Sequence, residues 1–437
     1  MARVAACRWS SLFCATVGLL GGAACALGGP DITHQEIQDA SNYGQVGGIY
    51  GYAWGSYTCN LGNQALSWIN GGTPALAMNA YRLSDGRLVQ IGLGNAKHAC
   101  CVGNGAGCGT CTSGGTGLRP GCRDIYSSGF NGGQSRLGPR SGIDPYTGTF
   151  TPIPSGTGNA IWRRVQVRAE EMSAATYPNA IFFAEGVYVC AEEEPVEQLN
   201  NATYRRMTVA NAGATPTYAW TVASGGASVS GQPAIYAWQQ HGNGVNTPDT
   251  SVRIVPADVP SEGRYFVAGK VRDLSGAGTG PWMYDYAVFN LNSHRSGASF
   301  SVAIASSATV TNIGFSSPPY HSGEPYDNSP WAGQTVGGAV RWTSPATYDE
   351  NQNTNALRWG TMYNFWFTAD VPPAAQFGTV TLGLFRPGTP TEIDANGLPV
   401  PTAPPACPGD FNGSGDISTQ DIFDFLAAYF SGSATAD

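Results

Sequence analysis

The stretch Trp282-Met283-Tyr284-Asp285-Tyr286-Ala287-Val288-Phe289-Asn290-Leu291 decides the fold class of this chain. Alternate side chains of a β-strand point to opposite faces. The stretch therefore predicts a strand with one face made of Tyr284, Tyr286 and Val288 and the other of Asp285, Ala287 and Phe289. On this interpretation Asp285 lies on the outward face of a sheet.

The same alternation recurs through the second half of the chain. In the run that ends at Thr368, Tyr363, Phe365 and Phe367 alternate with their neighbours. Eight short strands with turns between them are predicted, over residues 251–255, 263–271, 282–291, 299–304, 308–315, 339–343, 359–368 and 378–385. Strands of this length and spacing are typical of an antiparallel β-sandwich or a jelly roll, and the pattern leaves the choice open.

The first half also reads as β structure. Residues 50–54, 75–81 and 87–93 resemble short strands, and Asp85-Gly86 between the last two is a hairpin signal. The chain is too long for a single core. We therefore expect a Cys-containing β domain over residues 27–214 and a β-sandwich domain over residues 215–386.

Composition limits the classes of function. The 437 residues include 59 glycines, only 12% are charged, and the net charge is −8. This describes a turn-rich β protein. An acidic balance argues against a nucleic-acid partner, whose phosphates require a basic face, and it suits calcium and neutral glycans better.

The N-terminus has the pattern of an export signal. Arg3 and Arg8 precede an apolar run over residues 12–26, which ends in the small-residue cleavage pattern Ala24-Cys25-Ala26. We interpret residues 1–26 as a signal peptide. No other stretch is long and apolar enough to span a bilayer, so the mature protein is expected to be secreted, at the cell surface or in the periplasm.

Eight cysteines remain after the predicted signal peptide. An even number in an exported protein favours disulfides, and the candidates in the body are Cys59, Cys100, Cys101, Cys108, Cys111, Cys122 and Cys190. The alternative is a zinc or copper site built from Cys108-Gly109-Thr110-Cys111, Cys100, Cys101 and His98. The pairing cannot be derived from the sequence.

Residues 410–421 have the spacing of a calcium-binding loop of the EF-hand type. Gly415 stands at the sixth position, where such a loop turns sharply. Calcium ligands are expected at loop positions one, three, five, seven, nine and twelve, which are Asp410, Asn412, Ser414, Asp416, Ser418 and Asp421. The sequence therefore predicts Ca²⁺ as a bound cofactor.

The string Cys407-Pro408-Gly409-Asp410-Phe411-Asn412-Gly413, followed by residues 420–430, resembles a bacterial dockerin of the kind that opens with Cys-Pro. The resemblance covers about residues 406–432. It implies a small α module that folds around calcium and attaches a secreted protein to a cohesin-like or cell-surface partner. Dockerins carry two calcium repeats and residues 407–437 hold one, so we expect the chain to continue into a second. A Pro-rich linker, residues 387–406, precedes the module.

Two functions remain open for the β domains. They bind a glycan or a protein without catalysis, or they form a glycoside hydrolase, which requires two carboxylates; a zinc or copper enzyme is a third, less favoured alternative. The candidate binding loop is residues 318–331, with Tyr320, His321, Glu324, Tyr326, Asp327 and Trp331; its alternative is a Pro-stiffened connection that packs on the sandwich. No motif marks a catalytic pair among Glu185, Glu262, Asp273, Asp285, Glu324 and Asp327.

Overall fold

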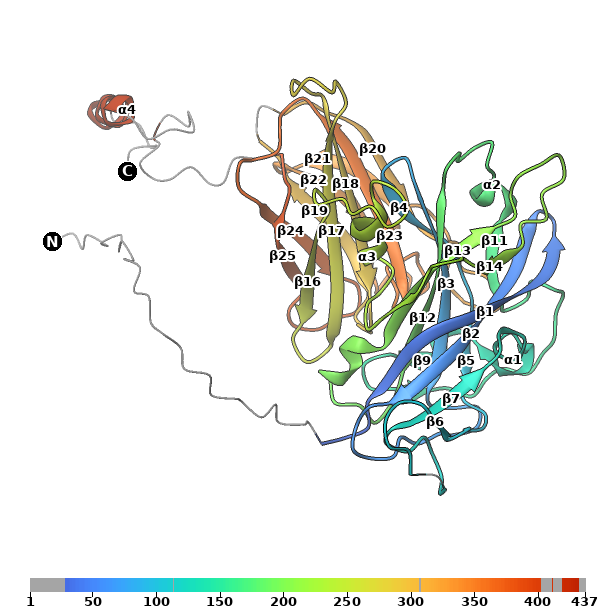
Figure 1. The fold of residues 1–437 in the computed structure, drawn as a ribbon. Helices are drawn as coiled ribbons and strands as arrows, with labels where there is room; N and C mark the ends of the chain where they lie inside the picture. Colours follow the sequence, from blue (N-terminus) through green and yellow to red (C-terminus); the bar gives the residue numbers. More distant parts are fainter. Residues whose placement is uncertain (1–27, 113, 306–307, 402–410, 412–418, 432–437) are drawn as a thin grey trace, which may run out of the picture.

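The computed structural model describes residues 28–112, 114–305, 308–401, 411 and 419–431. They form antiparallel β-sheets with a few short helices and one longer helix near the C-terminus (Figure 1). The prediction of a mainly β, antiparallel protein is confirmed. The predicted signal peptide, residues 1–26, lies outside the described residues.

The first half of the body is built on one large sheet, the N-terminal sheet. Its strands follow the order β14-β13-β12-β3-β4-β11-β2-β7-β6, with β1 beside β2, β15 beside β13, and β5 between β3 and β8. Their bounds are β1 Ile32–Val46, β2 Ile49–Asn60, β3 Ala75–Ser84, β4 Arg87–Leu93, β5 Ala96–His98, β6 Gly105–Ala106, β7 Cys122–Tyr126, β8 Leu137–Gly138, β11 Val165–Arg168, β12 Ile181–Val189, β13 Ala202–Val209, β14 Trp220–Val222 and β15 Ser228–Ser230.

Short elements connect these strands. They are the two-stranded ribbon of β9 Ile143–Asp144 and β10 Thr149–Phe150, the helices α1 Ser128–Asn131, α2 Ala169–Met172 and α3 Tyr236–His241, and the 3-10 turns η1 Gln134–Arg136, η2 Arg140–Gly142 and η3 Glu197–Asn200. The longer helix, α4, spans Thr419–Phe430.

The second half is a two-sheet sandwich. The middle sheet has the order β16-β17-β18-β23-β20 and the outer sheet the order β21-β22-β19-β24-β25. Their bounds are β16 Arg253–Val259, β17 Gly263–Asp273, β18 Trp282–Asn290, β19 Gly297–Ala303, β20 Val310–Ser316, β21 Ala332–Val336, β22 Ala339–Thr343, β23 Thr361–Ala369, β24 Gly378–Leu384 and β25 Glu392–Leu398. The chain alternates between the two sheets from β18 to β21, and both sheets are antiparallel.

All eight strands predicted in this half are present, and the predicted boundaries need two corrections. β14, β15 and α3 follow residue 214 but complete the N-terminal sheet and its packing, so the first domain extends past the predicted limit. β25 lies inside the predicted linker, residues 387–406, and pairs with β24, burying Ile393, Ala395 and Leu398. Buried and exposed side chains alternate along β25, as in a strand. The prolines on both sides of this segment favoured the prediction of a linker instead.

The hairpin between β3 and β4 forms as predicted. Asp85 and Gly86 both have positive φ, 51° and 73°, as the two central residues of a type I′ turn require. This turn carries Arg87 to the start of β4, at the boundary between the two halves of the body.

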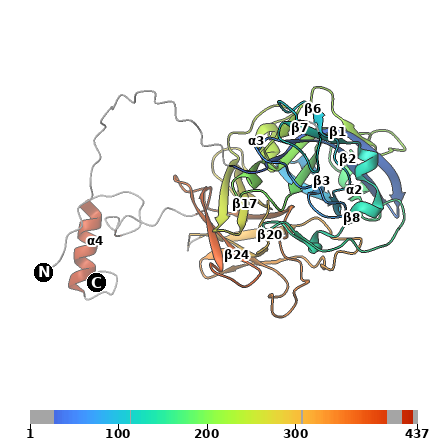
Figure 2. The same cartoon turned by 90° about the horizontal axis from the view of Figure 1, so that it is seen from below.

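The three sheets form successive layers, with the middle sheet covered on both faces (Figures 1 and 2). On one face Tyr284, Tyr286 and Val288 pack against the outer sheet. On the other, Ala287 and Phe289 pack against side chains of the N-terminal sheet. The two halves therefore share an apolar core at their boundary.

The prediction that Asp285 faces outward is wrong, because its side chain is 0% exposed. Arg272 of β17 donates to Oδ2 over 2.8 Å, and Arg87 of β4 donates to Oδ1 over 2.8 Å through Nε. Neighbouring bonds also cross the boundary: Asn364 donates to the Leu88 carbonyl over 2.8 Å. A buried carboxylate is tolerated here because both of its oxygens are paired with guanidinium groups.

Asp285→Asn tests this arrangement. Removing one partner of a buried ion pair leaves charge uncompensated, so the free energy of unfolding is expected to fall by about 3–5 kcal/mol. The matched control is Asp258→Asn, which breaks a comparable two-bond pair with Arg264 whose carboxylate is 55% exposed and is expected to cost under about 1 kcal/mol. Urea unfolding of both variants measures the difference; equal losses would contradict the role given to Asp285.

Candidate functional site

Helix α4 carries the described part of the predicted calcium site. Of the six predicted ligands, Asp421 is described, and Asp410, Asn412, Ser414, Asp416 and Ser418 lie outside the described residues. Asp421 stands in the first turn of α4 and is 2% exposed. The large apolar side chains of the same helix are all exposed. Their exposed fractions range from 38% for Leu426 to 80% for Phe430. On this helix an acidic side chain, Asp421, is shielded from solvent while the apolar side chains are exposed. In most proteins apolar side chains are buried and acidic ones exposed.

Two further features of this segment are described. Phe411 contacts Phe425 edge to face, with ring centroids 5.5 Å apart, so Phe411 lies against helix α4. Ile422, Phe425, Leu426 and Tyr429 recur at the spacing of one helix face and are all exposed. A helix is present where a small α module is expected, and among the described residues its apolar face is not buried.

The loop predicted to contact a glycan, residues 318–331, instead joins the two halves of the body. Trp331 and Tyr320 are 3% and 6% exposed. Trp331 belongs to the core between the middle and outer sheets, and the Tyr320 hydroxyl lies 3.1 Å from that of Tyr363. For these two aromatic residues the prediction is wrong, because rings packed in a core are not available to stack on a sugar.

The polar residues of the loop hold the N-terminal sheet and its connections. The His321 Nε2 lies 2.7 Å from the Leu93 carbonyl oxygen, and the Glu324 carboxylate accepts from the backbone N–H groups of Arg140 and Ser141. Burial raises the pKa of Glu324, although the bonds from Arg140 and Ser141 oppose the rise. Asp327 accepts from the Asn355 N–H over 3.2 Å. Tyr326 is half-buried, with Arg358 over its ring.

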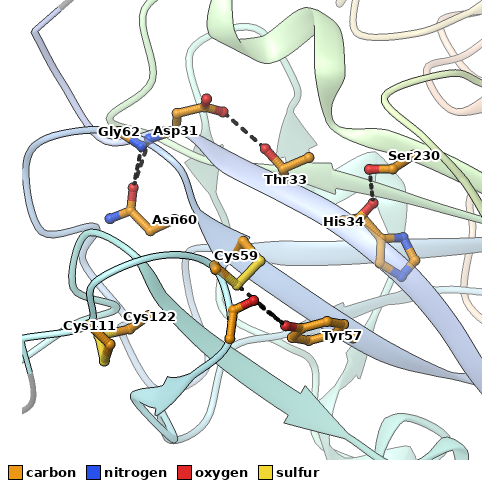
Figure 3. The surroundings of a disulfide bond; sticks show 12 residues. Asp31, Thr33, His34, Tyr57, Cys59, Asn60, Gly62, Cys111, Cys122 and Ser230 are labelled. Carbon is orange, nitrogen blue, oxygen red and sulfur yellow. Dashed lines mark hydrogen bonds between the residues drawn. A yellow bond between two sulfur atoms is a disulfide. The ribbon is translucent and has the colours of Figure 1, made fainter.

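Four of the predicted cysteines form disulfides. Cys59 pairs with Cys108, beside the Tyr57 hydroxyl that donates to the Gly107 carbonyl, and Cys111 pairs with Cys122 (Figure 3). The bonds join positions 49 and 11 residues apart. Loops of these lengths imply stabilisation by roughly 4 and 3 kcal/mol through the unfolded state. The disulfides fix a Gly-rich segment against β2 and β7.

The other three cysteines are free. For Cys190 the disulfide prediction is wrong: its thiol is buried among apolar side chains under the N-terminal sheet, where cysteine behaves as a small apolar residue. Cys100 and Cys101 lie at the surface. Two of the ligands of the zinc or copper alternative, Cys108 and Cys111, are in disulfides. In the described part of the chain no group of three His, Cys, Asp or Glu side chains is placed to hold a metal.

The candidate catalytic carboxylates are each engaged in structural contacts. Glu185 is buried and accepts from Asn79 Nδ2, Tyr81 Oη and the Ala234 N–H. Glu262 pairs with Arg295 over 2.6 Å. Asp273 accepts from residues of its own turn, and Asp285, Glu324 and Asp327 have the partners described above. Each of the six carboxylates therefore has its own structural partners, and these contacts favour no catalytic pair.

A groove on the outward face of the outer sheet was not predicted. It encloses about 470 Å³. Its floor includes Ser299, Thr343 and Gly383, which lie side by side on β19, β22 and β24 because Ser299 is the register partner of both others. Three small residues in a row leave a trough across the sheet.

Polar and aromatic groups line the rim of this groove. Tyr348 is half-exposed and held edge to face by the buried Phe385, with ring centroids 5.4 Å apart. Arg341, Glu350 and Glu392 add charged groups, and Glu350 is fixed by bonds from the Thr347 N–H and hydroxyl. The sequence shows Tyr348 after a Ser-Pro turn, but only the strand register reveals the trough beside it.

The chain matches no model of a known protein family and no curated protein sequence. Within the described ranges, none of the helices has the length and apolar character needed to cross a membrane.

His98, considered above as a metal ligand, sets a testable pH dependence. It is buried with a ring nitrogen 3.1 Å from the Gly71 carbonyl oxygen, and burial lowers its pKa from 6.5 to about 4. Between these values the unfolded chain binds more protons, so stability falls as the pH drops. His98→Gln is expected to reduce this loss between pH 6.5 and 4 by roughly 1–3 kcal/mol.

The measurement is urea unfolding of both proteins across that range. Part of the acid sensitivity remains in the variant, because burial also lowers the pKa values of His34 and His321 to about 4. Parallel stability curves for His98→Gln and the unchanged protein would contradict the assignment.

Proposed function

We propose that this is a secreted calcium-binding protein that attaches to an extracellular or surface partner through its C-terminal module and binds a polysaccharide with its β body. The observation that carries the calcium site is the shielded carboxylate of Asp421 on an otherwise exposed helix. In an EF-hand-type loop the twelfth residue is an acidic ligand at the start of the following helix. Asp421 has that position and that environment.

The module's surroundings support the same function. The contact between Phe411 and Phe425 brings the residue after the first proposed ligand onto the helix that carries the last one, as a closed loop requires. The exposed face of Ile422, Phe425, Leu426 and Tyr429 is of the kind that marks protein contact sites. Together with the resemblance to dockerins, it supports attachment to a cohesin-like or cell-surface protein.

Asp421→Asn tests the calcium site in the full chain. Losing the carboxylate that closes the loop is expected to weaken calcium binding by about tenfold or more, since an amide offers calcium one neutral oxygen in place of an anionic pair. Isothermal titration with calcium measures the change. Asp424→Asn is the matched control, because it removes the same charge from the same helix and should leave binding within about twofold. If both variants lost calcium affinity equally, Asp421 would act only through general electrostatic attraction and not as a calcium ligand.

The groove on the outer sheet is the proposed polysaccharide site. A volume of about 470 Å³ lies in the range of small-molecule sites, which combine apolar surface with a few placed polar groups. Tyr348 offers an aromatic ring for a sugar, and Ser299, Thr343 and Glu350 offer hydroxyl and carboxylate partners for its hydroxyl groups. The structural contacts of the six candidate carboxylates give the hydrolase alternative no specific support.

Tyr348→Ala tests this site by retention on insoluble polysaccharides. Stacking by one aromatic ring is expected to contribute about 1 kcal/mol or more, so retention should fall at least about fivefold. Tyr146→Ala is the control, because Tyr146 is also half-exposed and lines a different groove, beside β16. Release of reducing ends is followed in the same samples. Unchanged retention in Tyr348→Ala would exclude the groove, and release of reducing ends would establish a hydrolase instead.

A further inference from the structure

Cys100 and Cys101 are adjacent cysteines that follow β5 and take no part in the two disulfides. Their Sγ atoms are 2.7 Å apart. This is closer than the contact distance of two non-bonded sulfur atoms and longer than a disulfide bond of about 2.0 Å. Successive side chains of an extended strand point apart, so the irregular segment after β5 brings both thiols to one place.

The pair lies beside a cluster of rings and cations. Tyr126 and Phe130 stack with centroids 4.7 Å apart. Lys97 Nζ lies 3.5 Å from the centre of the Tyr126 ring, and the Arg136 guanidinium 4.6 Å from that of Phe130. The Cys101 N–H donates to the Tyr126 hydroxyl. The dithiol therefore lies beside two stacked rings and the basic side chains of Lys97 and Arg136.

Arg136 is the cation directed at the pair. It lies next to the Cys100 thiol, and its buried Nη1 has no hydrogen-bond partner within the described residues. Burial raises the pKa of Cys100, but contacts with Cys101 and Arg136 and the charge of Lys97 outweigh it, and the pKa is lowered. A cation beside a thiol favours the thiolate, which is the reactive form.

We propose that Cys100 and Cys101 form a redox site on the surface of the N-terminal domain, which closes into a vicinal disulfide on reaction with a low-molecular-weight disulfide such as oxidised glutathione. Cys100 is the attacking thiol and Cys101 the resolving thiol. The site is independent of the calcium module and of the groove.

The reaction proceeds in two exchange steps. The Cys100 thiolate attacks one sulfur of oxidised glutathione; a protein–glutathione disulfide forms, and one glutathione thiolate leaves. The Cys101 thiolate then attacks the Cys100 sulfur, the second glutathione thiolate leaves, and the Cys100–Cys101 bond forms. The two cysteines are oxidised, one glutathione disulfide is reduced to two thiols, and the two cysteine protons pass to those thiols.

The adjacency of the two residues makes the bond reversible. Consecutive Cα atoms are about 3.8 Å apart across a trans peptide, below the range of about 4.4–6.8 Å that disulfides usually span. Exposed or constrained disulfides are the labile ones, and Cys101 is exposed. The vicinal pair is therefore expected to be reduced at glutathione ratios that leave Cys59–Cys108 and Cys111–Cys122 intact.

The test incubates the folded full chain in buffers of graded reduced and oxidised glutathione, alkylates free thiols with N-ethylmaleimide and maps the peptides by mass. In oxidising buffer Cys100 and Cys101 should resist alkylation and their peptide should be lighter by two hydrogen atoms. In mildly reducing buffer both should be alkylated while the other two disulfides persist. The buried Cys190 should stay unmodified throughout, which reports that the protein remains folded.

Two variants assign the roles. Cys101→Ser should retain one glutathione on Cys100, because the resolving thiol is gone. Arg136→Gln should react with oxidised glutathione more slowly, by about fivefold, with the same end product. The proposal is overturned if both thiols remain free at every glutathione ratio, if either cysteine pairs with another residue, or if Cys101→Ser accumulates no glutathione adduct.

Discussion

Burial of the middle sheet on both faces is the constraint on which the body depends. A sheet in this position has no face to solvent, so each polar group on it needs a partner from another layer. Asp285 has Arg87 from the N-terminal sheet, and Asn364 donates to the Leu88 carbonyl. Arg140, itself buried, donates to the carbonyls of Met78, Gly94 and Gly360. These directional bonds fix how the two halves sit on one another.

Strand alternation allowed most of the sandwich to be predicted. The eight predicted strands of the second half form, because each has a continuous run of β-branched and aromatic residues bounded by turns. Two strands were missed for identifiable reasons. β21 is exposed along its whole length and has no apolar face, and β25 lies among prolines that favour a linker. Within one strand, period-2 alternation shows which residues share a face, not what covers that face.

The errors about individual residues have one common cause: the pattern within a segment does not show which other segments contact it. Asp285 looked outward-facing because nothing in β18 shows that a second sheet covers it. The loop 318–331 has the composition of a binding loop, yet Glu324 and His321 bind the backbone of the other half. The disulfide partners of Cys59 and Cys111 depend on how β2, β6 and β7 pair, which no spacing rule supplies. All three depend on contacts between segments far apart in the chain.

The layered arrangement also bears on the location of the proposed polysaccharide site. The middle sheet is covered on both faces, and the N-terminal sheet packs one face on the middle sheet and the other on a second core that includes its own folded-back strands. The outer sheet is covered on one face by the middle sheet, and its other face carries Arg341, Thr381 and Asp394 towards solvent. A broad, rigid β surface with small and polar residues is available there, and it is where the groove beside Tyr348 lies. A sheet face backed by two covered layers presents polar groups at fixed spacing, which a mobile loop cannot do without losing conformational entropy.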